Sequence, residues 1–158
     1  MARGIRRVVT GHNAQGQAVV KIDEMVEPQS VPSGDARFAK LWTTATSPAD
    51  NDDPYDGAQR PTGLTCPGGS VLRIVDMLPG RRSPMHRTNS IDYGIVLDGK
   101  IDLELDSGEV VHLAAGDVVV QRGSIHTWVN SSAQPSRIAF ILIAAKPATA
   151  GGRALEPT

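Results

Sequence analysis

Hydrophobic and polar residues alternate along this chain in short runs, and no helical periodicity is sustained. The alternation is clearest between residues 100 and 105, where Ile101, Leu103 and Leu105 fall on one side and the intervening residues are acidic. A repeat of two residues places every second side chain on the same face of an extended chain. The pattern therefore predicts a β-strand with one buried and one solvated face.

Similar runs recur through the chain, separated by turn residues. We predict strands at Arg6–Thr10, Gln17–Ile22, Arg37–Thr44, Ser70–Leu78, Ile91–Leu97, Lys100–Leu105, Glu109–Leu113, Val118–Gln121, His126–Asn130 and Arg137–Ala145. The Gly-His-Asn-Ala-Gln-Gly stretch predicts a hairpin loop, and the Asp98-Gly99 pair predicts a tight two-residue hairpin. Many short strands with tight turns favour an all-β, antiparallel barrel or two-sheet fold.

The length of 158 residues suits one domain. We expect residues 1–46 to supply N-terminal strands that pack on the barrel or on a partner subunit. Residues 47–69, which are largely polar and rich in proline, are expected to form a long polar loop. Residues 70–146 are expected to form the barrel core, and residues 147–158 an irregular C-terminal tail.

Charge and composition narrow the classes of partner. Sixteen basic and seventeen acidic residues are spread along the chain with no basic block, so we expect no nucleic-acid partner. The longest apolar run, Ile138–Ala145, is too short to span a bilayer, and the N-terminus lacks the apolar stretch of a signal peptide. Cys66 stands alone, which rules out an intramolecular disulfide and suits a reducing compartment. We therefore expect a cytoplasmic protein without membrane contact.

Two stretches carry glycine, histidine and acidic residues at fixed spacing. The first runs from Gly80 to Gly99 and contains His86, Thr88 and Asp92; the second runs from Gly116 to Asn130 and contains Gln121, Gly123 and His126. In these stretches the chain resembles the cupin superfamily, in particular its small single-domain bacterial and fungal members. Thr88 stands where the family has a second histidine, Asp92 where it has glutamate, and Gln121 where it has proline.

The resemblance implies a cupin jelly-roll β-barrel (a double-stranded β-helix) with a metal held by His86, Asp92 and His126. Two imidazoles and one carboxylate suit Fe, and Mn, Zn or Ni are alternatives, so a divalent transition metal is the expected cofactor. Residues two apart in a strand share a face, so His86 lies with Thr88, and His126 with Trp128. Aspartate is shorter than glutamate by about 1.5 Å, and this shortens its reach toward an ion.

A buried cation is predicted in the strand before the first motif. Alternation places Arg73 on the apolar face shared by Val71, Val75 and Met77, where an unpaired charge is costly. Its partner is either an internal carboxylate, for which Asp92 is the favoured candidate, or a carboxylate of the substrate. We therefore name Arg73, Trp128 and Thr88 as candidate substrate-binding residues, with Arg122 as the alternative to Arg73 for orienting an anionic group.

The first hypothesis for function is a metal-dependent enzyme of decarboxylase, isomerase or dioxygenase type. Its substrate would be a small organic acid or a polyketide- or aromatic-derived molecule, and His86 and His126 are its candidate catalytic residues. The alternative is a metal-free cupin, either a ligand-binding or sensor protein or an enzyme that uses one of these histidines as general acid or base. Analogy with the family also predicts a homodimer.

Overall fold

The computed structural model describes residues 4–158, and Met1–Arg3 lie outside the described residues. Within that range the chain forms fourteen strands and no helix. They are β1 (Ile5–His12), β2 (Ala18–Val26), β3 (Gln29–Ser30), β4 (Ala36–Thr44), β5 (Ser70–Met77), β6 (Arg81–Arg82), β7 (Ser90–Asp98), β8 (Lys100–Leu105), β9 (Val110–Ala114), β10 (Val118–Arg122), β11 (His126–Asn130), β12 (Ser136–Ala144), β13 (Thr149–Ala150) and β14 (Arg153–Ala154). The all-β prediction is confirmed, and each predicted strand is present with ends shifted by a few residues.

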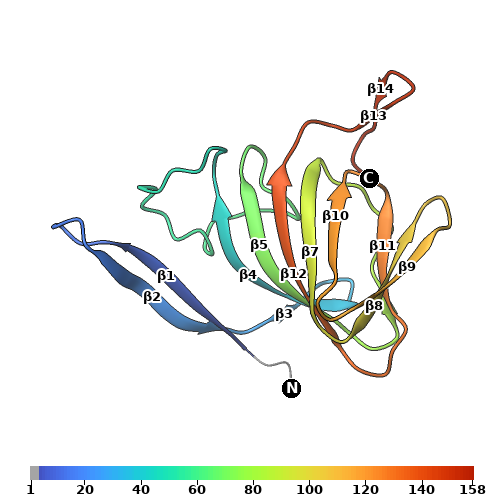
Figure 1. Cartoon of the computed structure of the whole chain (residues 1–158), viewed down its shortest axis with the longest axis horizontal. Coiled ribbons are helices and arrows are strands. Elements are labelled where there is room, and N and C mark those ends of the chain that lie inside the picture. The colour runs from blue at the N-terminus through green and yellow to red at the C-terminus, as the bar shows by residue number, and fades with distance from the viewer. Residues whose placement is uncertain (1–3) are drawn as a thin grey trace.

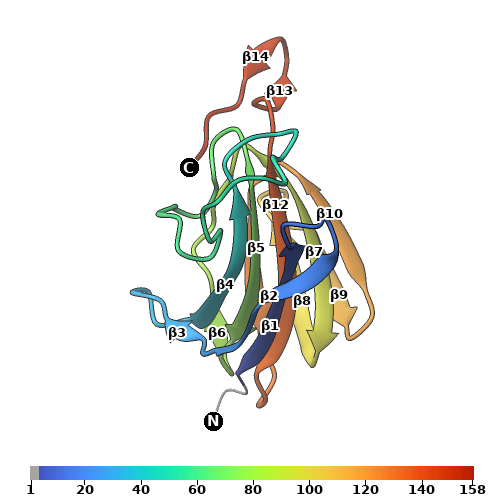
Figure 2. The ribbon, with the colours of Figure 1, turned by 90° about the vertical axis from the view of Figure 1, so that its left-hand side faces the viewer.

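Two antiparallel sheets face each other and form the barrel (Figure 1; Figure 2). The larger has the strand order β10-β7-β12-β5-β4-β3, and the smaller β6-β11-β8-β9. The main core cluster joins residues of both sheets: Val75, Met77, Val96 and Ile138 from the larger, and Ile101, Leu103, Leu113 and Trp128 from the smaller. Apolar residues at every second position give these strands an apolar inward face. Burying the inward faces requires the two sheets to cover one another.

The predicted Asp98-Gly99 hairpin is wrong. Strands β7 and β8 do not pair with each other; β7 pairs with β10 and β12, and β8 pairs with β9 and β11. The chain crosses from one sheet to the other at Gly99, which has a φ of +79°. This crossing lets Val96 and Ile101 enter the same core from opposite sides, which a flat hairpin would prevent.

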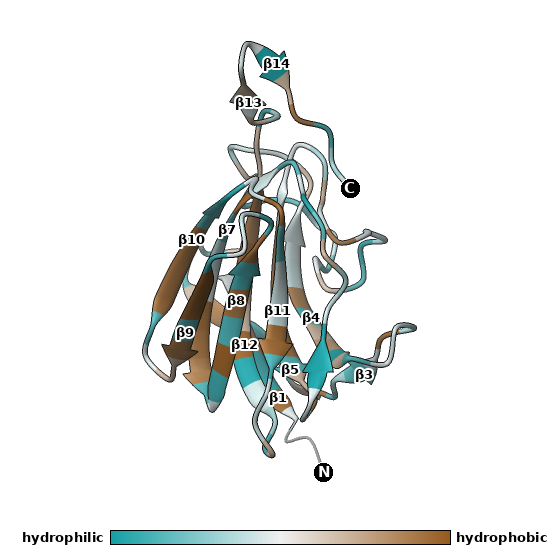
Figure 3. Cartoon of the chain, turned by 90° about the vertical axis from the view of Figure 1, so that its right-hand side faces the viewer, coloured by the Kyte–Doolittle hydropathy of each residue, from teal (hydrophilic) through white to brown (hydrophobic). Residues whose placement is uncertain are grey.

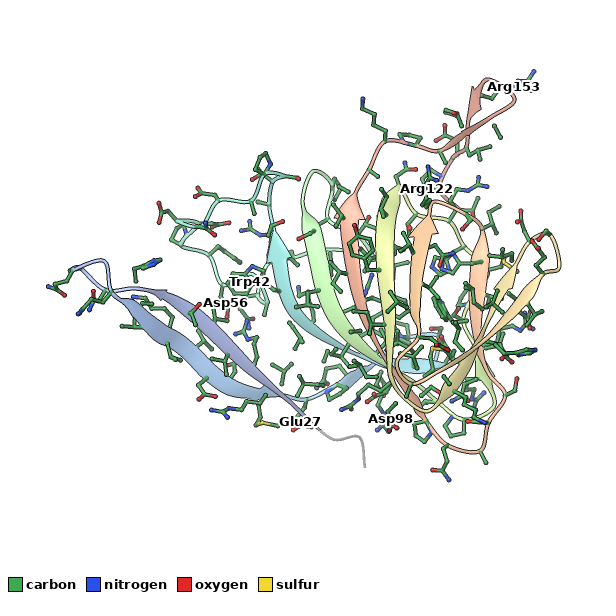
Figure 4. All side chains as sticks on the ribbon, in the orientation of Figure 1. Glu27, Trp42, Asp56, Asp98, Arg122 and Arg153 are labelled. Atoms are coloured by element: carbon green, nitrogen blue, oxygen red, sulfur yellow. The ribbon has the colours of Figure 1, made fainter. Side chains whose placement is uncertain are left out.

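The N-terminal hairpin of β1 and β2 pairs only within itself among the described residues, and its far end projects away from the barrel (Figure 1). Its near end packs Ile5 and Val26 against a second apolar cluster formed by β4, β5 and β12. The buried Arg7 guanidinium forms an ion pair of 2.6 Å with Asp56 of the long loop. Figure 4 shows Asp56 in the space between this hairpin and β4. The hairpin is thus anchored to the outside of the larger sheet at one end.

Residues 47–69 contain no strand, in keeping with a long loop. The tail after residue 146, expected to be irregular, contains the short antiparallel pair β13–β14. Two adjacent glycines with positive φ, Gly151 and Gly152, turn the chain between these strands. Apolar side chains are exposed along β9 and β10, which Figure 3 shows as hydrophobic strips. In residues 4–158 no helix is long and apolar enough to cross a membrane.

Candidate functional site

A cavity of about 540 Å³ lies inside the barrel. All six predicted site residues line it, namely Arg73, His86, Thr88, Asp92, His126 and Trp128. They come from both sheets: Arg73 lies on β5 and Asp92 on β7, whereas His126 and Trp128 lie on β11. A cavity of this size fits a small organic molecule. The sequence therefore identified six residues of the cavity wall, although not their contacts.

His86 and His126 lie side by side, forty positions apart in the chain. An isolated antiparallel bridge joins them through two backbone hydrogen bonds of 2.9 and 3.0 Å, and their ring centroids are 4.4 Å apart. The predicted meeting of the two imidazoles inside the barrel is confirmed. Each ring places Nδ1 against a carbonyl oxygen, that of Pro84 at 2.9 Å and that of Ser124 at 3.0 Å.

These carbonyl contacts determine the tautomer of both rings. A carbonyl oxygen can only accept a hydrogen bond, so each Nδ1 must carry a proton and donate it. In the neutral imidazole, Nε2 then keeps its lone pair. Because both residues line the cavity, the pair offers it two unprotonated nitrogens. Such nitrogens can accept a proton, accept a hydrogen bond or coordinate an ion.

The two imidazoles differ in environment. The side chain of His126 is buried, and this burial lowers its pKa to about 4, an effect that the hydrogen bond to the Ser124 carbonyl only partly opposes. The neighbouring His86 lowers the pKa of His126 further. His126 is therefore neutral at physiological pH, whereas His86 is partly exposed at the cavity wall.

Asp92 enters the cavity from the sheet opposite the histidines. Its carboxylate accepts hydrogen bonds from the hydroxyls of Ser90, at 2.5 Å, and Thr88, at 3.5 Å. Burial raises the pKa of Asp92, and the Ser90 hydrogen bond and the charges of Arg73 and His86 act against that increase. Thr88 and Asp92, the two residues of the first motif that depart from the pattern the chain resembles, thus contact each other.

This arrangement bears on the expected metal. Among residues 4–158, no three His, Cys, Asp or Glu side chains come together as a group able to hold a metal ion. The two imidazole rings are adjacent, with centroids 4.4 Å apart, but the short Asp92 side chain starts from the opposite sheet and accepts hydrogen bonds from two hydroxyls. The three-ligand set does not fit an ion in this conformation, and assignment of His86, Asp92 and His126 as ligands stays a prediction.

Arg73 lies at the cavity wall and is 7 % exposed. The favoured direct ion pair with Asp92 is not formed, since no carboxylate oxygen of the described residues lies within 4 Å of its guanidinium. Nη2 instead donates to the carbonyl of Leu64, and the guanidinium lies over the Phe38 ring at 5.1 Å. Asp92 still attracts it through space. The long loop, rather than an acidic side chain, therefore holds Arg73.

Several cavity residues were missed by the sequence reasoning. Two loops contribute, through Val31, Pro32, Ser33, Asp35, Gly63 and Leu64, and strands contribute Phe38 and Phe140. Phe38 and Phe140 lie in predicted strands, so alternation could have identified them. The only feature of the sequence that could have identified Leu64 is that it is an apolar residue in a polar segment.

Arg122 does not line the cavity and lies at the end of β10 (Figure 4). His112 is exposed and paired with Asp102 at 2.7 Å.

Comparison with known sequences identifies a matching family model and several similar proteins. Residues 73–142 match the family model described as "Cupin domain". The chain is 46% identical to "Phomopsin biosynthesis cluster protein C'" of Diaporthe leptostromiformis over 94% of this chain and 83% of that protein. It is 36% identical to "Cupin-domain-containing oxidoreductase virC" of Hypocrea virens, over 92% of this chain and 80% of that protein.

Solved structures share the fold. The polyketide cyclase RemF from Streptomyces resistomycificus superimposes with a TM-score of 0.55 at 22% identity, covering 78% of this chain and 77% of that one. The cupin domain of Schizosaccharomyces pombe Cnp3 has the same TM-score at 14% identity, covering 88% and 87%. At these identities the likeness concerns the fold alone, and it confirms the predicted jelly-roll barrel.

Proposed function

The chain belongs to the cupin family, and from this premise we propose that it is an enzyme that moves a proton on a small molecule bound in the barrel. The reaction type is isomerisation next to a carbonyl group, one of the three types that the sequence suggested. The observation that carries the proposal is the bridged histidine pair, in which both Nδ1 atoms donate to backbone carbonyls and both Nε2 atoms are left for a ligand. Relatives from biosynthetic clusters support a role in building small molecules.

In this proposal His86 is the base and His126 a fixed hydrogen-bond acceptor. Nε2 of His86 takes a proton from the carbon between the substrate carbonyl and a C=C double bond, and the electron pair of that C–H bond forms a dienolate. The resulting imidazolium returns the proton to the far carbon of the former double bond, so the double bond moves next to the carbonyl and no oxidant or reductant is needed. A pKa of about 4 makes His126 too weak a base for this step at neutral pH, but its neutral ring can accept a hydrogen bond from a substrate hydroxyl.

Asp92 supports the same assignment. Its carboxylate attracts a positive charge on His86, so it stabilises the imidazolium that proton transfer creates. The apolar rings of Trp128 and Phe140, which contact each other edge to face at 5.3 Å, form part of the cavity wall. An apolar wall strengthens charge interactions at the moment when the enolate forms.

The test follows hydrogen exchange in phenylpyruvate, which has an apolar ring and an acidic C–H next to a carbonyl. The protein is treated with a chelator and mixed with phenylpyruvate in D₂O, and the methylene signal is followed by NMR. We expect the protein to accelerate its loss, and His86→Gln to lower the protein-dependent rate by about 100-fold or more, since glutamine cannot take the proton. His112→Gln is the matched control, because that histidine is exposed and outside the cavity.

Two results would contradict the proposal. One is an exchange rate equal to that of buffer; the other is a His86→Gln protein as fast as wild type. If exchange instead disappears on chelation and returns with Fe, Mn, Zn or Ni, the metal-dependent reading holds. Two observations favour this second candidate: the two imidazole rings, whose centroids are 4.4 Å apart, and the relatives named oxidoreductases.

We also propose that the protein is a homodimer. The N-terminal hairpin supports this, because Val8, Val20 and Met25 are about half exposed on it and have no covering element in the described chain. Burying such side chains against a second copy is favourable. Sedimentation equilibrium at micromolar concentration should give twice the chain mass, and a single-chain mass would overturn the proposal. A cytoplasmic location stays a prediction.

A further inference from the structure

Two other arginines that are withdrawn from solvent are paired with carboxylates. The buried Arg7 meets Asp56 at 2.6 Å, and the partly buried Arg137 meets Asp76 at 2.6 Å. Arg73 is about as buried as Arg7, yet within residues 4–158 its guanidinium has a single hydrogen bond, to the Leu64 carbonyl, and no carboxylate within 4 Å. Leaving a buried cation without a counter-ion is costly, so the exception needs an explanation.

A second cation lies beside Arg73. In the pairing of β4 with β5, Lys40 stands directly opposite Arg73. Its ammonium also donates to a backbone carbonyl of the long loop, that of Arg60, rather than to a carboxylate. Like charges at directly opposite positions of a sheet destabilise it. The loop carbonyls soften this repulsion, but a full negative charge would relieve it.

No carboxylate of the cavity contacts Arg73. Asp92 attracts the Arg73 guanidinium through space, but its carboxylate accepts hydrogen bonds from the hydroxyls of Ser90 and Thr88 instead. Asp35 precedes Ala36, whose partner on β5 is Met77, and its backbone carbonyl accepts from the amide of Leu78. Four to five strand residues separate that point from Arg73, which is on the order of 15 Å along the strand. The negative Asp35 and the positive Arg73 therefore lie at different ends of the cavity.

Between these polar points the wall is apolar. It is formed by Val31, Phe38, Leu64, Trp128, Phe140 and Leu142. We infer that the ligand of this cavity is a small, largely apolar carboxylic acid whose carboxylate binds the Arg73 guanidinium beside Lys40. The inference rests on the proposed function only for the claim that this ligand is the substrate. At neutral pH the guanidinium is charged, because burial lowers the pKa of Arg73 only to about 10.

The test is a binding measurement with two molecules of equal shape, 3-phenylpropanoate and the neutral 3-phenylpropanamide. Titration calorimetry on the chelator-treated wild-type protein should show the carboxylate binding about 10- to 100-fold more tightly, as expected for a charge-assisted hydrogen bond in a buried site. Arg73→Gln should bring the two affinities to within about threefold of each other, and Arg73→Lys should keep part of the preference. Arg122→Gln is the matched control and should leave the preference unchanged.

Equal affinities of the wild-type protein for the two molecules would overturn the inference. This measurement needs no variant, so the inference can be tested even if Arg73→Gln fails to fold. A preference that survives in folded Arg73→Gln would overturn it as well. Neither molecule contains a ketone or aldehyde, so binding is measured apart from proton transfer. A carboxylate preference without hydrogen exchange in phenylpyruvate would refute only the proposed function, and exchange without the preference would refute only the carboxylate site.

Discussion

The clearest quantitative consequence of the site concerns the acid stability of the protein. His126 is 3 % exposed and its pKa is lowered to about 4, against 6.5 for the free side chain. Between these two values the unfolded chain binds a proton that the folded chain does not. Acidification therefore stabilises the unfolded state, and the stability that neutral His126 allows at pH 7 is lost as the pH falls from about 6.5 toward 4.

The magnitude follows from the same two values. Each pKa unit corresponds to about 1.4 kcal/mol, so His126 alone should remove ~3 kcal/mol of unfolding free energy between pH 7 and pH 4. Other groups titrate in this range. The raised pKa of Asp92 acts in the opposite direction, and the lowered pKa of Asp56, which is paired with Arg7, acts in the same direction. The contribution of His126 must therefore be isolated by a variant.

His126→Gln removes the titrating ring. Urea unfolding in chelator-containing buffer gives the free energy of both proteins at pH 7, 5.5 and 4. We expect the wild-type value minus the variant value to fall by ~3 kcal/mol from pH 7 to pH 4. Thr127→Val is the matched control, because it removes a buried hydroxyl that donates to the Ser83 carbonyl but no titrating group. Its difference from wild type should not change with pH, and a His126→Gln difference that is equally constant would refute the reasoning.

Three other changes test parts of the fold that position the site. Asn130→Asp should cost about 3 kcal/mol or more in urea unfolding, because the fully buried amide donates to two backbone carbonyls that a carboxylate would repel; a variant as stable as wild type would contradict this. Gly99→Ala should destabilise the protein by about 2 kcal/mol more than Gly108→Ala. Both glycines have positive φ, but only at Gly99 would a Cβ meet a backbone oxygen, at 2.9 Å. Equal losses of unfolding free energy would refute the effect of that contact. Arg7→Gln should release the N-terminal hairpin from Asp56 and speed proteolysis within residues 47–69 several-fold. Binding of 3-phenylpropanoate should persist. An unchanged cleavage rate would show that the ion pair does not hold the loop.

The roles given to the two histidines depend on small differences between their surroundings. Both make the same contact from Nδ1, yet one side chain is buried and the other is partly exposed. A base must exchange its proton at the operating pH, which favours the accessible ring, whereas a hydrogen-bond acceptor must stay neutral, which favours the buried one. His86→Gln should therefore affect the exchange rate, whereas His126→Gln should affect the dependence of stability on pH.

The sequence by itself predicted the strands, and the resemblance of its two motifs to the cupin superfamily implied the jelly-roll barrel and the histidine pair. The strands follow from a local rule, because alternation of apolar residues fixes which side of a strand is buried and which side chains share a face. Arg73 was identified in the same way, as a cation on an apolar face. Alternation is a property of neighbouring residues, so it can be recognised in the sequence without knowing which strands pair in the sheets.

Only the tertiary structure decided what each of these side chains touches. Gly99 sends the chain to the opposite sheet instead of into a hairpin, and Asp92 therefore faces the histidines from across the barrel rather than beside them. Leu64, from a loop with no periodic pattern, takes the hydrogen bond that sequence reasoning gave to Asp92. Such contacts depend on strand order and on loop paths, which join residues far apart in the chain, and a local repeat of two carries no information about them.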